Sequence, residues 1–394
     1  MANALTFNQI SAVMNEIYQQ ATGRSDPAPV DTQSFVTQGQ KALLAGMDPL
    51  LNSISQVLSR TIFSIRPYSR KFGGLEVDEI KWGNHVRKLT NADTPFENDD
   101  RYDLVDGEPG PDMFKVKKNK VLQTNFYGKE VFQFQSPTYF RDQLDVAFRG
   151  PDEFARYITM VMQNASDILE QGREGLARSL VCNLIGSRKS FDNGENVVHL
   201  VTEYNEYTGL SLDTNTVKEP ENFTPFAKWC FARIRTLRDM MTERTSLFQT
   251  NIEGYEINRH TPLDRQKVYL LADLINHIDA EVLSSVYNEE FLRYGDHERV
   301  NFWQNPKDPY FVSVSPNGID NQGNIISTPA DEPVLVQNVV GVIFDEEAIG
   351  YTVANQWSGA SPFQVRGGYY NLFHHETLNY WEDNTEKSVV LLLD

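Results

Sequence analysis

The longest regular pattern of apolar and polar positions in this chain lies between residues 150 and 187. Apolar or small residues recur there at steps of three and four, at Phe154, Ile158, Val161, Ala165, Ile168, Gly172, Leu176 and Leu180. That spacing places them on one face of an α-helix. Pro151 suits a first helical turn, and Asp152 and Glu153 put negative charge at the positive end of the helix dipole. We predict a helix over residues 151–185, a length typical of a strut and not of a compact catalytic pocket.

Two amphipathic helices are predicted ahead of this long helix. The first spans Leu5–Thr22 and ends at Gly23, and the second runs from Gln38 to about Arg60, with Pro49 as a kink. The segment 24–33 between them contains two prolines and is predicted to be extended. The pattern leaves two alternatives open: the helices lie on a neighbouring molecule, or they form a layer on their own subunit.

Between residues 61 and 134 the pattern changes to alternating, β-prone stretches with glycine-rich turns. An acidic run separates two strand-like arms: Glu97, Asp99, Asp100, Asp103, Asp106, Glu108 and Asp112. The returning arm is basic, with Lys115, Lys117, Lys118 and Lys120. We predict a long, polar β-hairpin. Because two strands alone are marginally stable in water, we expect it to lie against another surface, although a solvated hairpin stays an alternative.

The remainder of the chain mixes strands and helices. We predict strands over 197–204, 266–273, 299–303, 334–344, 369–381 and 388–393, helices over 224–241 and 279–287, a short helix beginning at Asp345, and an exposed loop over 306–333. The strand at 266–273 and the apolar closing strand both require burial inside a sheet.

Composition narrows the function. The chain has 394 residues and a net charge of -18, which argues against a dedicated nucleic-acid binder and favours solubility. Cys182 and Cys230 are the only cysteines, so a disulfide framework or a cysteine zinc site is not expected, and we predict a reducing compartment. The first residues do not resemble a signal peptide, and no apolar run approaches the roughly 18 residues that a membrane span needs.

Candidate catalytic and metal-binding groups are few. Asp273, His277 and Glu281 have helical i, i+4, i+8 spacing and could ligate a metal, but such spacing is common among surface charges. Neighbouring residues on a strand point to opposite faces, so His374 and His375 would not share one ion. Three acids of the long helix form ordinary helix pairs or a solvated or interface face: Asp167, Glu170 and Glu174, with Glu170–Arg173 and Glu174–Arg178 as the pairs. We predict no catalytic, cofactor or metal site and no enzyme.

Gly172 and Gly175 interrupt the long helix at a cost of about 1 kcal/mol each relative to alanine. Two explanations remain open: a local bend, or close approach of another backbone.

The order of these segments resembles the HK97-fold major capsid proteins of tailed double-stranded DNA bacteriophages. Three stretches carry the resemblance besides the order: VVGVIFDEEAIGY at 339–351, the closing NLFHHETLNYWEDNTEKSVVLLLD at 371–394, and INRHTPLDRQKVYLLADLINHIDAEVLSSVYNEEFL at 257–292. The resemblance implies an α+β, HK97-like capsid fold with these parts: an N-terminal arm at 1–60, an extended β-hairpin E-loop region at 61–135, a P-domain at 136–222 with spine helix 151–185, an A-domain at 223–360, and a return to the P-domain at 361–394.

The resemblance also implies a function. The expected role is a major capsid protein whose copies form pentamers and hexamers of an icosahedral shell around double-stranded DNA, assembled in the bacterial host cytoplasm. Expected partners are further copies of the chain, a portal, a separate scaffolding protein (since too few residues precede Leu5 for a scaffolding segment) and DNA through weak contacts, but no membrane. Candidate contacts between subunits are Lys115, Lys117, Lys118, Lys120, Asp99, Asp100, Asp103, Gly172 and Gly175. Covalent cross-linking is not predicted.

Three alternatives stay open. An encapsulin-like nanocompartment shell shares the fold and carries enzymes in place of a genome. A metal-dependent hydrolase would use Asp273, His277 and Glu281. A portal or tail protein is the third.

Overall fold

The structure, a computed structural model, describes residues 7–44, 70–77, 85–94, 114, 116–135, 139–140, 150–191, 194–282, 297–329 and 331–394. The chain divides into two compact units. Unit 1 comprises residues 1–84, 129–176 and 352–379, and unit 2 comprises residues 85–128, 177–351 and 380–394.

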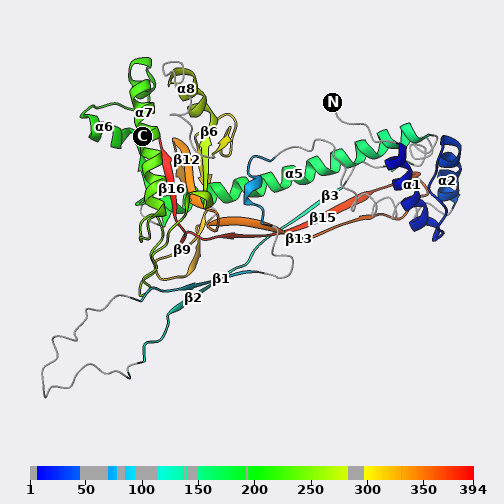
Figure 1. The fold of residues 1–394 in the computed structure, drawn as a ribbon, viewed down its shortest axis with the longest axis horizontal. Coiled ribbons are helices and arrows are strands. Elements are labelled where there is room, and N and C mark those ends of the chain that lie inside the picture. Colours follow the sequence, from blue (N-terminus) through cyan, green and yellow to red (C-terminus); the bar gives the residue numbers. More distant parts are fainter. Residues whose placement is uncertain are drawn as a thin grey trace. The chain divides into compact units, whose positions relative to one another are not determined.

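The predicted long helix is confirmed and extends further than expected. Helix α5 spans Pro151–Ser190, 40 residues, and contributes its first part to unit 1 and its last part to unit 2 (Figure 1). Arg188 and Lys189 lie in its last turn, where positive charge is favourable near the negative end of the helix dipole. These charges favour a helix end beyond residue 185.

Unit 1 contains the two N-terminal helices, α1 at Phe7–Thr22 and α2 at Thr32–Leu44. The ring of Phe35 in α2 is fully buried and lies 5.6 Å from the ring of Phe154 in α5. The described part of α2 therefore packs on its own subunit, as one of the two alternatives predicts.

The prediction for the start of the second helix was wrong. Helix α2 begins at Thr32, six residues before the expected position, because Asp31 acts as its N-terminal cap: the backbone N–H of Ser34 donates to Asp31 Oδ1 at 2.7 Å. Gly23 ends α1 as predicted, with a positive φ of 68°. The later part of the predicted helix, including Pro49, lies outside the described residues.

The sheets of unit 1 come from distant segments. One sheet has the strand order β13-β15-β3, with β13 at Ile349–Ala360, β15 at Leu372–Glu382 and β3 at Gly128–Gln135. The first residues of β13 and β3 and the last residues of β15 belong to unit 2. Strand β4 at Tyr139–Phe140 pairs with β14 at Tyr369–Tyr370. A short 3-10 helix, η1 at Gly73–Leu75, completes the described elements of this unit.

Unit 2 is built on a five-stranded sheet with the order β5-β16-β12-β6-β7. These strands span Val197–His199, Ser388–Leu392, Val339–Asp345, Gln266–Leu271 and Glu298–Val300. Helices α6 at Leu200–Thr208, α7 at Pro220–Thr242 and α8 at Ala272–Val282 share one apolar core with this sheet (Figure 1). The predicted burial of residues 266–271 and of the closing strand is confirmed.

Several local predictions in unit 2 were wrong. The predicted strand at 197–204 becomes helix α6 after His199, because the backbone N–H groups of Val201 and Thr202 donate to the carbonyl oxygen of Asp394. That cap comes from almost 200 residues away and leaves no local pattern. Helix α7 begins at Pro220 and contains Pro225.

The stretch predicted as one strand at 334–344 is divided in two. Strand β11 spans Val334–Val336 and β12 starts at Val339, because Asn338 adopts the left-handed conformation with φ 57°. The short helix expected at Asp345 is a turn: the backbone N–H of Glu347 donates to Asp345 Oδ1, which gives an Asx-type turn between β12 and β13.

The segment predicted as an exposed loop over 306–333 contains three short strands, β8 at Val312–Val314, β9 at Asn317–Ile319 and β10 at Ile325–Ser327. Strand β8 pairs with β11, and β9 with β10. Val312 and Ile319 are buried. The sequence did not predict this burial, because many polar and turn-forming residues surround them.

Candidate functional site at the base of a β-hairpin

The predicted hairpin is present in unit 2 as two paired strands. Strand β1 at Val86–Asn91 and β2 at Val121–Phe126 are antiparallel, with Val86 opposite Phe126 and Asn91 opposite Val121 (Figure 1). The acidic run that the sequence places between them lies outside the described residues, including Asp99, Asp100 and Asp103.

The hairpin has two unlike faces. Along β1 the less exposed positions alternate with exposed ones, so Lys88 and Thr90 share the inner face while Leu89 faces outward. On the outer face, Leu89 is 58% exposed and Val121 is 51% exposed. A two-stranded ribbon needs support from another surface. In this protein, the contacts that support the hairpin are made by its inner face.

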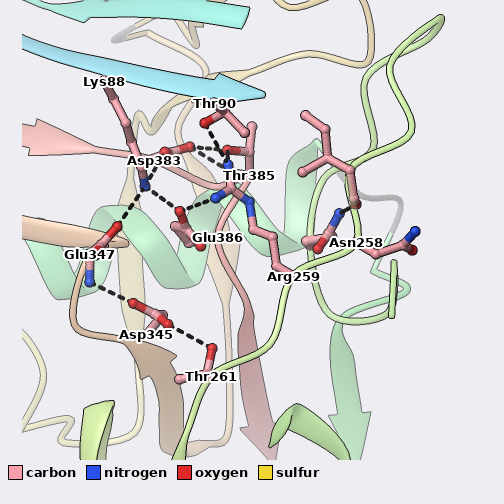
Figure 2. A network of polar contacts seen from close by, with 12 residues as sticks. Lys88, Thr90, Asn258, Arg259, Thr261, Asp345, Glu347, Asp383, Thr385 and Glu386 are labelled. Atoms are coloured by element: carbon pink, nitrogen blue, oxygen red, sulfur yellow. Dashed lines mark hydrogen bonds and ion pairs between the residues drawn. The ribbon is translucent and has the colours of Figure 1, made fainter. Parts of the chain in front are cut away.

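Lys88 is the centre of that support. Its ammonium lies 2.9 Å from Asp383 Oδ2, in direct contact with Glu386 Oε1 and 3.7 Å from Glu347 Oε2. Figure 2 shows Lys88 reaching from the hairpin strand into this group of carboxylates. The side chains of Asp383 and Glu386 are almost completely buried. Buried carboxylates of this kind require a cation nearby.

The local charges hold Lys88 and Asp383 in their ionised forms. Burial would lower the pKa of Lys88, but attraction to Asp383 and Glu386 outweighs it, so this pKa is raised. Burial would likewise raise the pKa of Asp383, but Lys88 and a hydrogen bond from Thr385 outweigh it, so this pKa is lowered. For Glu386, burial prevails over Lys88 and Arg259, and the pKa is raised.

Arg259 is the second cation of the cluster. Its guanidinium contacts Glu386 Oε1 and donates to Thr385 Oγ1 at 3.1 Å and to Thr90 Oγ1 at 3.3 Å (Figure 2). Thr90 is a hairpin residue, so Arg259 joins the hairpin to the same acidic loop that holds Lys88. We call Lys88, Arg259, Asp383 and Glu386 the charge cluster.

The acidic loop itself is unusual because five consecutive polar residues are buried. Asp383, Asn384, Thr385, Glu386 and Lys387 are each at most 4% exposed. We call residues 383–387 the polar loop; it joins β15 to β16.

Each end of the polar loop is bound to a different segment. Asn384 Nδ2 donates to the carbonyl oxygen of Ile319 at 2.9 Å and to Thr250 Oγ1 at 3.0 Å. Lys387 Nζ donates to Thr245 Oγ1 at 3.0 Å and to the carbonyl oxygen of Leu247 at 2.9 Å, and burial lowers the pKa of Lys387 to about 8. The loop is therefore held in place independently of the hairpin.

Helix α5 also reaches this loop. Arg188 is fully buried, and its guanidinium donates to Ser388 Oγ and to the carbonyl oxygen of Glu386, both at 2.6 Å. Beside it, Asn183 Nδ2 donates to Glu382 Oε1 at 3.0 Å, and burial raises the pKa of Glu382 to about 7. The end of the long helix thus packs on the base that carries the hairpin.

A second clamp holds the hairpin beyond Asn91. The carboxylate of Asp93 contacts Arg244 and accepts hydrogen bonds from the backbone N–H and side-chain amide of Asn258, at 3.0 and 3.1 Å. Lys120 Nζ donates to the carbonyl oxygen of Gly254 at 2.8 Å.

Three of the predicted lysines meet at this clamp. Lys117, Lys118 and Lys120 line a cleft of about 440 Å³ together with Asp93 and Glu256. Lys115 lies outside the described residues. The structure thus brings together the three described lysines, and the acidic residues predicted to complement them are not among the described residues.

The two glycines of the long helix have different surroundings. A Cβ atom at Gly172 would lie 3.7 Å from the ring of Phe132, an ordinary van der Waals distance, and one at Gly175 would meet nothing within 4 Å. Within the described part of the chain, no close backbone contact requires glycine at either position. Their role between subunits stays a prediction.

The predicted solvated face of the long helix was partly wrong, because acids of this face are bound to residues 70–76 of the same unit. Glu170 pairs with Arg173 at 3.3 Å, as predicted, and also with Arg70 at 2.5 Å. Glu174 is 6% exposed and accepts hydrogen bonds from the backbone N–H groups of Lys71 and Phe72. Spacing along a helix cannot reveal a distant segment that satisfies the same carboxylates.

The histidine candidates are separated as expected. His374 stacks on Phe134 at 4.7 Å between ring centroids, and His375 stacks on Trp357 at 3.9 Å. Glu376 next to them is buried and accepts from Arg173 Nε at 2.9 Å.

The candidate metal residues lie on α8. Asp273 and His277 are both exposed, and Asp273 Oδ1 is 3.8 Å from His277 Nε2. Asp273 also accepts a hydrogen bond from the hydroxyl of Tyr310 at 2.6 Å. The side chain of Glu281 is outside the described part, and among the residues that are described no three His, Cys, Asp or Glu side chains are grouped to hold a metal ion.

The polar loop and Arg259 were missed by the sequence analysis. A run such as DNTEK between two apolar strands has the composition of an exposed turn, and no periodicity distinguishes a buried run from an exposed one. Over the ranges that the structure describes, no helix is long and apolar enough to span a bilayer.

Comparison with known proteins gives a consistent picture. The family model of the Phi29-like phage major capsid protein matches residues 10–390. The fold is similar to a capsid structure of Staphylococcus phage Andhra, with a TM-score of 0.54 and 10% identity over 85% of this chain and 87% of that chain. It is also similar to a chain in a structure of head fiber and inner core protein gp22 of native bacteriophage P68, with a TM-score of 0.55 and 11% identity over the same shares. A search of curated protein sequences found no match.

Proposed function

Because its match to the family model runs over residues 10–390, the chain belongs to the Phi29-like phage major capsid protein family, and we propose that its copies form the pentamers and hexamers of an icosahedral shell around double-stranded DNA. The protein has an α+β, HK97-like fold and a structural role in the phage capsid. The family match is the observation that carries the proposal. Catalysis forms no part of the proposed function.

The proposed division of the subunit follows the order of its elements. Residues 1–60 serve as the N-terminal arm, 61–135 as the E-loop region, 136–222 as the P-domain, 223–360 as the A-domain and 361–394 as the return to the P-domain. The β1–β2 pair inside residues 61–135 supports the E-loop assignment, since it projects two apolar side chains, Leu89 and Val121, into solvent.

Contacts between subunits are proposed to use both charge and apolar surface. Lys115, Lys117, Lys118 and Lys120 provide the basic side, and Asp99, Asp100 and Asp103 the acidic side, of a contact that selects register more than affinity. Gly172 and Gly175 are the proposed places where a neighbouring chain approaches the spine helix. Each surface ion pair contributes only about 0–1 kcal/mol, so repetition over many interfaces is what makes such pairs effective.

The proposed partners outside the shell are a portal and a separate scaffolding protein, with assembly in the host cytoplasm. The net charge of -18 supports weak, non-specific contact with the packaged DNA, because a subunit with a net negative charge does not hold a polyanion tightly. A DNA container that must release its content benefits from this weakness.

Electron microscopy of the expressed protein, alone and together with the other head proteins of its phage, tests the proposal. We expect closed shells of uniform diameter containing or able to take up DNA. Particles filled with an enzyme and free of DNA would instead indicate an encapsulin-like compartment. A protein that stays a monomer in every combination, and that carries stoichiometric Zn²⁺ or Mn²⁺ by metal analysis, would overturn the proposal in favour of a hydrolase.

A further inference from the structure

We infer that Lys88 is a positioning residue: the charge cluster sets the direction in which the β1–β2 hairpin leaves its subunit, and this direction limits the range of geometries open to the contact with the next copy. The inference rests on the proposed role in shell assembly and assigns to the four residues of the charge cluster a part in controlling it.

The first argument is that Lys88 and the carboxylates of the charge cluster come from two different segments, the hairpin and the polar loop. Lys88 and Thr90 belong to the hairpin, whereas Asp383 and Glu386 belong to the polar loop. The polar loop is held from behind by Arg188 and by the bonds of Asn384 and Lys387. A hairpin bound to a loop that is itself bound on several sides has one preferred direction.

The second argument is the kind of interaction. Apolar contacts tolerate sliding because they have no preferred direction, whereas the bonds of Lys88 and Arg259 to carboxylates and hydroxyls require defined distances and angles. Breaking even one partner of a buried pair leaves an uncompensated charge. A hairpin turned away from the polar loop would leave Asp383 and Glu386 buried without Lys88.

The third argument is register. Side chains alternate along β1, so moving the strand by one residue would exchange Lys88 for Arg87 or Leu89 on the inner face. With Leu89 in the place of Lys88, the carboxylates of the polar loop would lose a cation. With Arg87 in that place, Leu89 would replace Thr90 and could not accept the hydrogen bond of Arg259. The cluster therefore accepts one register as well as one direction.

The fourth argument is leverage. A strand of six residues, such as β1, is about 20 Å long, so a rotation of about 10° at its base moves its far end by roughly 3–4 Å. That displacement exceeds the length of a hydrogen bond. The copies of a closed shell must keep their mutual rotations within narrow limits, and a loose base would widen the spread of contact geometries beyond them.

The test uses the double variant Lys88→Met with Asp383→Asn, which removes one charge of each sign and leaves Arg259 paired with Glu386. Shells of this variant are expected to vary in diameter or to remain open, whereas native shells are expected to be uniform. The conservative variant Lys88→Arg keeps the charge and is expected to keep most shells uniform. Native-like uniform shells from the double variant would overturn the inference.

The matched control is Arg233→Met with Glu203→Gln. This ion pair, with 2.6 Å between Arg233 Nε and Glu203 Oε2, joins α7 to α6 in the same unit, and its polar contacts among the described residues involve neither β1 nor β2. We expect the control to form shells of native diameter. An equal loss of uniformity in the control would show that any lost ion pair has this effect, and the special position of Lys88 would be refuted.

Hydrogen exchange of the unassembled subunit keeps this test separate from the proposed function. In the double variant we expect amides of residues 86–91 and 121–126 to exchange about tenfold faster, equivalent to about 1.4 kcal/mol, with strands β12 and β16 unchanged. Unchanged hydrogen exchange in β1 of the double variant would overturn the inference even if the native protein forms shells. If the native protein forms no shells, that result alone would refute only the shell assignment. If the double variant does not fold, Glu386→Gln replaces it, since it keeps the shape and removes one charge.

Discussion

Strand β16 and strand β1 lie in the same unit but are held in opposite ways. All five residues of β16 are buried, four of them valine or leucine, between β5 and β12. Among the described strands, β1 pairs only with β2, and its inner face is bound to the rest of the unit through Lys88 and Thr90. One strand is stabilised by apolar burial, and the other is positioned by charges.

The difference matters because apolar burial and buried ion pairs contribute differently to stability and to orientation. Burial of apolar area stabilises in proportion to the area, at about 25 cal/mol per Å², and depends little on orientation. A buried ion pair is close to neutral compared with apolar residues of the same size. The charges at the hairpin base therefore contribute definition of position more than stability, which suits a segment that must meet another molecule.

Leu391→Ala should give the largest loss of stability among the changes considered. Leu391 is fully buried in β16, and such a truncation costs about 2–5 kcal/mol because a cavity remains. Chemical denaturation of the unassembled subunit measures it. Leu335→Ala, at a position 56% exposed, serves as the control and should cost far less. Equal losses for the two variants would contradict the assigned burial.

Glu382→Gln tests a carboxyl group that is buried close to the charge cluster but pairs with an amide in place of a cation. The pKa of Glu382 is raised to about 7 from its ordinary value of 4.5, so the folded protein resists its ionisation. The native free energy of unfolding should fall as pH rises from about 4.5 to about 7 and then level off, by up to about 3 kcal/mol at 1.36 kcal/mol per pKa unit.

The glutamine variant should lack this fall, because its side chain has no charge to bury. It should be equal to the native protein in stability near pH 4 and more stable near pH 8. Glu253→Gln, at an exposed position, is the control. If the free energy of unfolding depended on pH in the same way in the native protein and in Glu382→Gln, the prediction would be contradicted. The contrast between Glu382, which pairs with an amide, and the carboxylates that pair with Lys88 would then be weaker.

Reversal of the hairpin lysines tests surface charge. Changing Lys115, Lys117, Lys118 and Lys120 to glutamate should slow shell assembly, with a defect that depends on ionic strength because exposed charges are screened by salt. Loss of subunit stability should be at most about 1 kcal/mol per residue. Light scattering at several salt concentrations measures assembly. Reversal of Lys228 and Lys307, which are exposed and outside the hairpin, is the control. Assembly that is unchanged at every salt concentration would remove the electrostatic contact.

Leu89→Asp should have the smallest effect on the subunit. Because Leu89 is 58% exposed, the free energy of unfolding of the subunit should change by no more than about 0.5 kcal/mol. Assembly should nevertheless be strongly reduced if this face meets a neighbour, since a charge would then be buried without a partner. Sedimentation of assembled material measures this. Leu263→Asp, at a position 49% exposed outside the hairpin, provides the comparison; equal assembly of both variants would contradict the assignment.

The candidate site was only partly accessible to sequence reasoning. The hairpin and its lysines follow from alternation and charge, and three of the lysines do line one cleft. Lys88 and Arg259 carry no signal of their role, because a lysine on an alternating strand and an arginine in a turn-rich stretch are ordinary surface residues in a sequence. Their importance depends on carboxylates about 300 and 127 residues away.

The amino-acid sequence by itself determined the elements whose stability is local or apolar: the long helix α5, the buried strands β6 and β16, and the paired strands of the hairpin. Periodicity encodes these, because an element that buries one face must repeat its apolar residues at the period of its backbone. Only the tertiary structure decided the strand-to-helix change at His199, the burial of the polar loop and the partners of Glu170, Glu174 and Lys88. In each case a polar group is satisfied by a segment far along the chain, and the free energy of that contact depends on distance and direction in three dimensions.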